Sequence, residues 1–120
     1  MLKLKIRMMA VILFAVFFYG CEPAYPSTPE YFNKVADAIY LAENSTKYPY
    51  GIKSINTHGN KAYARKITIQ TIINNWKRWE KDGKRQDYID FLGDRYCPKS
   101  ADPKGHAVWA KNVKYFLEKN

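Results

Sequence analysis

The feature that most constrains the fold is a long amphipathic segment in the middle of the chain, over residues 61–81. The β-branched run Ile67-Thr68-Ile69 fits a strand when taken alone, but the apolar pattern continues at helical spacing and favours a helix. A helix with so wide an apolar face needs other elements to cover it. The segment therefore predicts a helical domain whose core includes these residues: Ile69, Ile72, Ile73, Trp76 and Trp79.

Three further segments have helical patterns and are bounded by residues that begin or end helices. The first runs from Pro29 to Glu43, with Ser27 or Thr28 as its N-cap and Asn44 after it. The others cover residues 86–96 and residues 106–119. Their expected apolar faces are Tyr88, Phe91, Leu92 and Tyr96 in one, and Val108 or Trp109, Val113, Phe116 and Leu117 in the other.

Together these segments predict a small, mainly α-helical domain of about four helices over residues 30–120. Long loops are expected at residues 44–60 and 97–105, where Pro and Gly interrupt the helical pattern. Loops of this length in a compact domain are often functional.

The first twenty residues have the pattern of a bacterial signal peptide. Three basic residues precede an uncharged apolar run, Met8 to Tyr19, which is too short for a permanent membrane-spanning helix. The run Phe18-Tyr19-Gly20-Cys21 resembles a lipobox, which implies removal of residues 1–20, lipidation of Cys21 and a tether over residues 21–29. An ordinary signal peptide and an uncleaved anchor are the alternatives. We expect an exported protein of the bacterial cell envelope, attached to the membrane through a lipid on Cys21.

The charge of the chain suggests its kind of partner. The formal net charge is +9, and it falls to +6 when the three basic residues of the signal peptide leave. An exported basic domain suits an anionic surface such as cell-wall polymer, lipopolysaccharide or phospholipid. Export argues against nucleic acid as the partner, and we expect a monomer.

Cysteine and histidine usage gives no indication of a metal or cofactor. The chain has two cysteines and two histidines, and they lack the spacing of a zinc site. Lipidation of Cys21 leaves Cys97 without a partner for a disulfide. We expect Cys97 to be a half-buried structural thiol.

Glu43 is the main candidate for chemistry. It continues the apolar stripe of Phe32, Ala36 and Ile39, so a carboxylate falls on a face otherwise made for the core. Burial and the negative end of the helix dipole both favour the protonated form there, and a carboxyl group that keeps its proton can act as a general acid. The alternative is a solvated charge at a helix end. Asp94 is a weak candidate for a second acid.

Tyrosines accompany Glu43 in the loops. Tyr48 and Tyr50 follow it closely, and Tyr96 precedes the second long loop. Flat faces with hydroxyl edges suit sugar rings, so these side chains are candidates for lining a groove. Trp76 and Trp79 are expected in the core.

The residues around Glu43 resemble a known family. Ala38 to Ser45, followed by Tyr48-Pro49-Tyr50-Gly51-Ile52, resembles the catalytic region of soluble lytic transglycosylases and goose-type lysozymes. The tract from Tyr88 to Val113 resembles the end of small phage-associated muralytic domains. The resemblance implies a lysozyme-like fold with Glu43 as the catalytic acid. It implies a substrate cleft formed by Tyr48, Tyr50, Gly51, Ile52 and Tyr96, where Tyr96 takes the place of the family's assisting tyrosine.

The resemblance also implies a function and a partner. We expect a lytic transglycosylase or muramidase that cleaves the glycan strands of peptidoglycan without a metal or cofactor. The alternative is a non-enzymatic surface lipoprotein that binds cell wall or a partner protein. A membrane-active toxin is a third possibility that the signal peptide allows.

Overall fold

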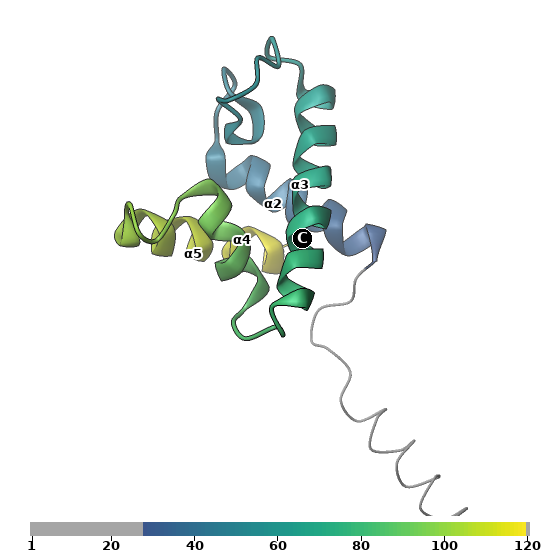
Figure 1. The fold of residues 1–120 in the computed structure, drawn as a ribbon. Helices are drawn as coiled ribbons and strands as arrows, with labels where there is room; N and C mark the ends of the chain where they lie inside the picture. Colours follow the sequence, from purple (N-terminus) through teal and green to yellow (C-terminus); the bar gives the residue numbers. More distant parts are fainter. Residues whose placement is uncertain (1–27, 120) are drawn as a thin grey trace, which may run out of the picture.

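Four α-helices form the part of the chain, residues 28–119, that a computed structural model describes (Figure 1). They are α2 (Pro29–Glu43), α3 (Lys61–Lys81), α4 (Tyr88–Tyr96) and α5 (Pro103–Lys119), with a short 3-10 turn, η1 (Pro49–Gly51), between α2 and α3. The range contains no β-strand, so the predicted mainly helical domain is confirmed. The predicted signal peptide, Cys21 and the tether up to residue 27 lie outside the described residues. No helix within residues 28–119 has the length and apolar character needed to cross a bilayer.

Helices α2 and α3 have the predicted boundaries because capping residues define their ends. Thr28 is the N-cap of α2, and its hydroxyl accepts a hydrogen bond from the backbone N–H of Tyr31 at 3.2 Å. Asn44 ends the same helix in the left-handed conformation, with φ of 46°, which asparagine tolerates well. Asn60 caps α3 by accepting from the N–H of Tyr63 at 3.0 Å.

Helices α4 and α5 begin at other residues than predicted. Helix α4 begins two residues later, because Asp87 acts as its N-cap and accepts from the N–H of Asp90. Helix α5 begins three residues earlier, with Pro103 in the first turn and the Asp102 carboxylate accepting from the N–H of Gly105 at 2.9 Å. The loop predicted over residues 97–105 is therefore shorter.

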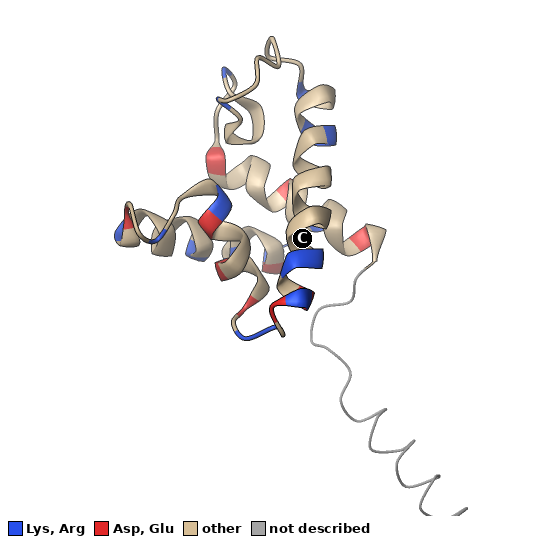
Figure 2. Ribbon diagram, in the orientation of Figure 1, with Lys and Arg blue, Asp and Glu red and all other residues tan. Residues whose placement is uncertain are grey.

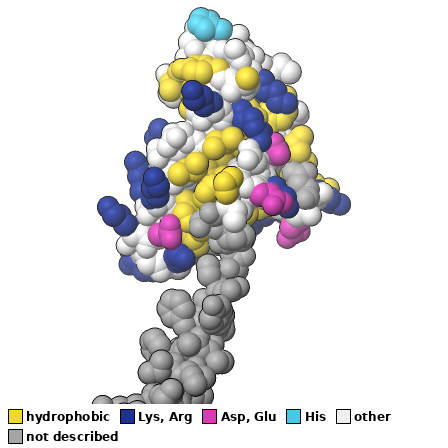
Figure 3. Space-filling model, turned by 90° about the vertical axis from the view of Figure 1, so that its right-hand side faces the viewer, with side chains coloured by type: hydrophobic (Ala, Val, Ile, Leu, Met, Phe, Trp, Pro, Cys, Tyr) yellow, Lys and Arg dark blue, Asp and Glu magenta, His cyan; other side chains and the backbone are white. Residues whose placement is uncertain are grey.

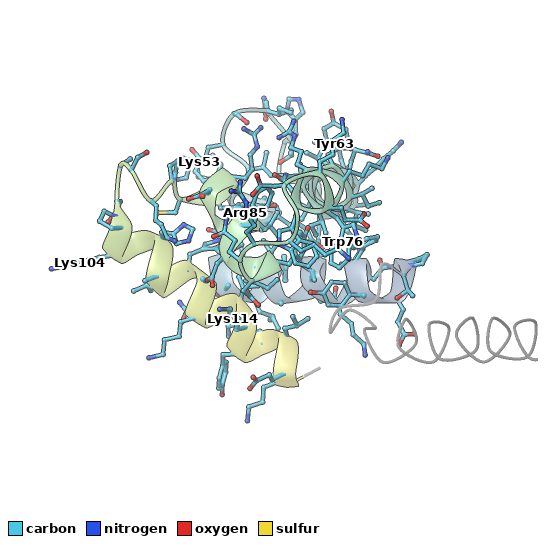
Figure 4. The ribbon with its side chains drawn as sticks, turned by 60° about the horizontal axis from the view of Figure 1, so that its bottom comes forward. Lys53, Tyr63, Trp76, Arg85, Lys104 and Lys114 are labelled. Atoms are coloured by element: carbon cyan, nitrogen blue, oxygen red, sulfur yellow. The ribbon has the colours of Figure 1, made fainter. Side chains whose placement is uncertain are left out.

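An aromatic cluster holds α2, α3 and α4 together. Trp76 extends from α3 toward α2 (Figure 4), where its ring meets Phe32 with centroids 5.6 Å apart. On its other side Trp76 meets Tyr88 of α4 at 4.7 Å, and the Tyr88 hydroxyl donates to the carbonyl of Ile72 at 2.6 Å. Trp76 and Trp79 are core residues, as predicted. Helix α5 adds Trp109 to the core, whereas Val108 is exposed, which decides between the two predicted alternatives.

The loop between α2 and α3 stands out at the top of Figure 1, beside the first turns of α3. Arg65 of α3 ties this loop to α2. Its guanidinium donates to the Asp37 carboxylate at 2.6 Å, to the Tyr50 hydroxyl at 3.0 Å and to the Asn33 side chain at 3.1 Å. One cation therefore fixes α2, η1 and α3 relative to one another.

Basic residues occur on each of the four helices (Figure 2). On the face shown in Figure 3, Lys and Arg side chains surround a band of hydrophobic side chains. Positive charge is thus spread over the domain.

Candidate functional site

Glu43 is the last residue of α2, and its carboxylate is held by a residue from the other end of the chain. Trp109 of α5 donates its indole N–H to Oε1 of Glu43 at 3.0 Å. The indole is itself buried and stacks on the ring of Tyr96, with centroids 4.9 Å apart and an interplanar angle of 15°. Glu43 is only partly exposed. Its carboxylate therefore has an orientation set by the packing of α4 and α5.

On another side, the carboxylate of Glu43 lies against the backbone of Gly51. A Cβ atom built on Gly51 would lie 2.6 Å from Cδ of Glu43 and 2.7 Å from its Oε2, far inside van der Waals contact. Gly51 also has a φ of +71°, a conformation that side chains disfavour. Only glycine allows this approach of loop and carboxylate without a shift.

The turn η1 brings Gly51 to this position. The N–H of Gly51 donates to the carbonyl of Tyr48 at 2.8 Å. Tyr50 has a left-handed φ of 61°, which for a residue with a side chain is disfavoured by about 1–2 kcal/mol. Burial of its ring offsets this: Tyr50 is 1% exposed, lies 5.1 Å from the ring of Tyr40 and accepts a hydrogen bond from Arg65. The ring of Tyr50 thus anchors the turn and is not offered to a groove, in contrast to the prediction.

A groove of about 490 Å³ lies next to Glu43: its wall includes Gly51, which the Glu43 carboxylate contacts, whereas Glu43 itself is not a lining residue. It runs between the loop that follows η1 and one side of α3, and it reaches the end of α4. Gly51 and Tyr96, the two residues that connect it to Glu43 and Trp109, both belong to its wall. Its lining consists of Gly51, Ile52, Lys53, Ser54, Ile55, Ile67, Thr68, Thr71, Arg95 and Tyr96, which include no acidic residue.

Tyr96 is a proton-bearing group at this groove. Burial raises the pKa of its hydroxyl well above the usual range, and the charge of Glu43 raises the pKa further. A hydrogen bond with Thr68 and the charge of Arg95 partly oppose these effects. The phenol therefore keeps its proton and remains a hydrogen-bond donor across the physiological pH range.

Four of the predicted site residues lie together. Glu43 and Gly51 are in contact, Ile52 continues the groove wall, and Tyr96 stacks on the tryptophan that binds Glu43. Tyr48 is exposed and lines a neighbouring hollow of about 440 Å³.

Two weaker candidates for chemistry lie at the connection between α4 and α5. Asp94 accepts from the N–H of Lys99 at 3.1 Å and lies 3.4 Å from Nδ1 of His106, and it is not part of the groove wall. Cys97 is partly buried, as expected, with its Sγ 3.9 Å from the carbonyl of Asp102. His106 lies in α5, and its Nδ1 is 2.9 Å from the carbonyl of Cys97.

The sequence pattern does not reveal the role of Trp109. Its spacing with Val113 indicates a core position, and nothing in the local sequence links it to a carboxylate 66 residues earlier. The hydrogen bond of Thr68 with Tyr96 is likewise not evident from the sequence, where Thr68 is one of several β-branched residues in a row. The role of Trp109 arises only when α5 packs against α2, and that of Thr68 only when α3 packs against α4.

Comparisons with known proteins leave the site to be interpreted from its own geometry. No family model, no curated protein and no solved structure matches the chain. Within residues 28–119, no group of three or more His, Cys, Asp or Glu side chains is placed to hold a metal ion. The chemistry of the site therefore rests on Glu43 and its neighbours.

Proposed function

We propose that the protein is a peptidoglycan-cleaving lytic transglycosylase in which Glu43 acts alone as acid and base. The observation that carries this proposal is the oriented carboxylate of Glu43 in contact with Gly51, a wall residue of a groove whose own lining contains no carboxylate. A volume of about 490 Å³ lies in the usual range of small-molecule sites. The tyrosine edge and the apolar residues of the wall suit the mixed surface of a sugar ring.

The proposed reaction needs one carboxyl group. Glu43 first gives its proton to the glycosidic oxygen as the bond from that oxygen to C1 breaks. It then takes the proton of the 6-hydroxyl group on the sugar that contains C1. The oxygen of this hydroxyl bonds to C1 at the same time, which closes a 1,6-anhydro ring. The proton is thus returned to Glu43, and no water is consumed.

The neighbours of Glu43 have positioning roles in this scheme. The indole N–H of Trp109 fixes Oε1 and so sets the direction in which the carboxyl presents its proton. The protonated hydroxyl of Tyr96 supplies a hydrogen-bond donor at the wall of the groove, near the charge of Glu43.

A single acid favours transglycosylation over hydrolysis. A hydrolase of the paired-carboxylate kind places a second Asp or Glu across the substrate to activate water or to act as nucleophile. Such a residue is absent from the groove wall among the described residues, and Asp94 is engaged with Lys99 and His106.

Digestion of purified sacculi, followed by mass spectrometry of the released muropeptides, tests this function. We expect anhydro-ended products from the wild-type protein and a loss of at least about 10²-fold in Glu43→Gln, the scale of general acid–base catalysis. Glutamine keeps an oxygen for the Trp109 N–H, so the fold should be retained. Asp94→Asn is the matched control and should keep wild-type activity.

Each other result has a definite meaning. Products with reducing ends would identify a hydrolase. Release by Glu43→Gln at the wild-type rate would exclude Glu43 from the mechanism. No products from the wild-type protein would refute the enzymatic proposal and favour a lipoprotein that only binds.

A further inference from the structure

Two lysines of the loop between α2 and α3 approach the same aromatic ring. Nζ of Lys47 lies 5.3 Å and Nζ of Lys53 lies 5.7 Å from the centroid of Tyr48. Both lysines are exposed, and within residues 28–119 neither forms a salt bridge. Two like charges near one ring repel each other, and a bound anion offsets that repulsion.

Some cations elsewhere in the described residues have acidic partners, whereas others, such as Lys66 and Lys77, form no salt bridge. Figure 4 shows Lys53 on the loop and Lys114 beyond α5, on different sides of the molecule. Lys114 lies between two carboxylates, at 3.2 Å from Asp90 and 3.4 Å from Asp87. Similar pairs are Lys34 with Glu30, Arg65 with Asp37, and Arg85 with Asp82. Lys47 and Lys53 differ from the other unpaired lysines in that both approach the ring of Tyr48 and both line one hollow.

The lysines line a hollow that opens beside the groove of Glu43. The hollow has a volume of about 440 Å³, and its wall contains no acidic residue: Lys47, Tyr48, Ile52, Lys53, Ile55, Asn56, Thr57, His58 and Gly59. Ile52, Lys53 and Ile55 belong to both the hollow and the groove. A polymer that lies in the groove can thus place a side group in the hollow.

We propose that this hollow binds the carboxylates that peptidoglycan carries beside its sugar backbone, so that the protein prefers acidic strands to neutral amino-sugar polymers. The inference rests on the proposed function, because it assumes that the backbone lies in the groove. Carboxylates come from two sources: the free lactyl group of a muramic sugar that carries no peptide and, where that group is bound in an amide, the carboxylates of the stem peptide. Both supply the negative partner that Lys47 and Lys53 do not have within the described residues.

Binding to the inactive Glu43→Gln protein, measured by isothermal titration calorimetry, separates this inference from catalysis. The probes are a muramic-acid-containing tetrasaccharide with free lactyl groups, the same glycan bearing stem peptides, and neutral chitotetraose. The variant Lys47→Gln with Lys53→Gln removes both charges of the hollow. The control, Lys66→Gln with Lys77→Gln, removes two exposed lysines of α3 that line neither depression.

We expect each hollow lysine to contribute about two- to fivefold in affinity for the charged glycans, as exposed ion pairs do. Affinity for chitotetraose should not change, and the difference should shrink as salt is added. Weakened binding of the peptide-free glycan identifies lactyl carboxylates as the ligand. Weakened binding of the peptide-bearing glycan alone identifies the stem peptide.

The inference is overturned if the hollow variant binds charged and neutral glycans with equally reduced affinity, if its effect equals that of the control, or if no probe binds. The proposed function fails separately. Wild-type protein that binds charged glycans through these lysines but releases no product from sacculi would refute catalysis and support the hollow. Cleavage of sacculi combined with lysine-independent binding would support catalysis and refute the hollow as a carboxylate site.

Discussion

The contact between Gly51 and Glu43 can be tested by one added methyl group. In Gly51→Ala the new Cβ would lie 2.6 Å from Cδ of Glu43, and the φ of +71° would be disfavoured. The backbone effect is about 1–2 kcal/mol. Moving the carboxylate away also breaks its hydrogen bond from Trp109, and bonds to charged groups contribute about 1.5–3 kcal/mol. Because water reaches the partly exposed Glu43 and replaces part of this loss, we expect the free energy of unfolding to fall by about 2–4 kcal/mol.

Gly59 supplies a matched control for the backbone effect. It has the same φ of +71°, but a Cβ there would meet no atom within 4 Å. Gly59→Ala should therefore lose only about 1–2 kcal/mol. The assay is denaturant unfolding followed by circular dichroism, with sacculus digestion in parallel. In a protein that already carries Glu43→Ala, Gly51→Ala should lower the free energy of unfolding only as much as Gly59→Ala does in the wild type. Equal losses in the two single glycine variants would refute the reasoning.

Two further predictions concern Trp109 and the buried tyrosines. Trp109→Phe keeps a ring against Tyr96 but removes the donor to Glu43, so peptidoglycan release should fall by about ten- to hundredfold; an unchanged rate would show that this bond does not orient the acid. Burial raises the pKa of both Tyr88 and Tyr96 above the ordinary value of 10. The unfolded chain then releases these two protons first, so their contribution to stability is intact below about pH 10 and is lost as the pH rises further. Absorbance at 295 nm checks this: in folded protein at pH 11, Tyr88→Phe and Tyr96→Phe should leave the tyrosinate signal unchanged, and a drop in either variant would contradict the assigned burial.

The sequence predicts most of the fold because the helix signals are local. The bounds of α2 and α3 follow from caps and spacing that lie within a few residues of each end. The predicted start of α5 is too late because Gly105, taken from the sequence alone, indicates a loop. In the structure Gly105 is in the first turn of α5, and a Cβ there would collide with the Asp102 carboxylate. Glycine is therefore present for close packing within the helix, although it is more typical of turns.

The site is predictable only in part, because half of it depends on contacts between distant elements. Glu43 stands out through its position on an apolar stripe, and the resemblance to muralytic domains indicates Gly51 and Tyr96. No local pattern shows that Tyr50 adopts a left-handed conformation and buries its ring. The hydrogen bond from Trp109 to Glu43 depends on how α5 packs against α2. Spacing along one helix carries no information about such a partner.

The central claim is that the Glu43 carboxyl serves a glycan bound in the groove beside Gly51 and Tyr96. A crystal structure of the Glu43→Gln protein with a muramic-acid-containing tetrasaccharide tests it most directly. We predict that the sugars lie along the groove between the loop after η1 and α3, with the residue 43 amide within hydrogen-bonding distance of a glycosidic oxygen. A glycan bound elsewhere, with residue 43 out of reach of any glycosidic bond, would contradict the account.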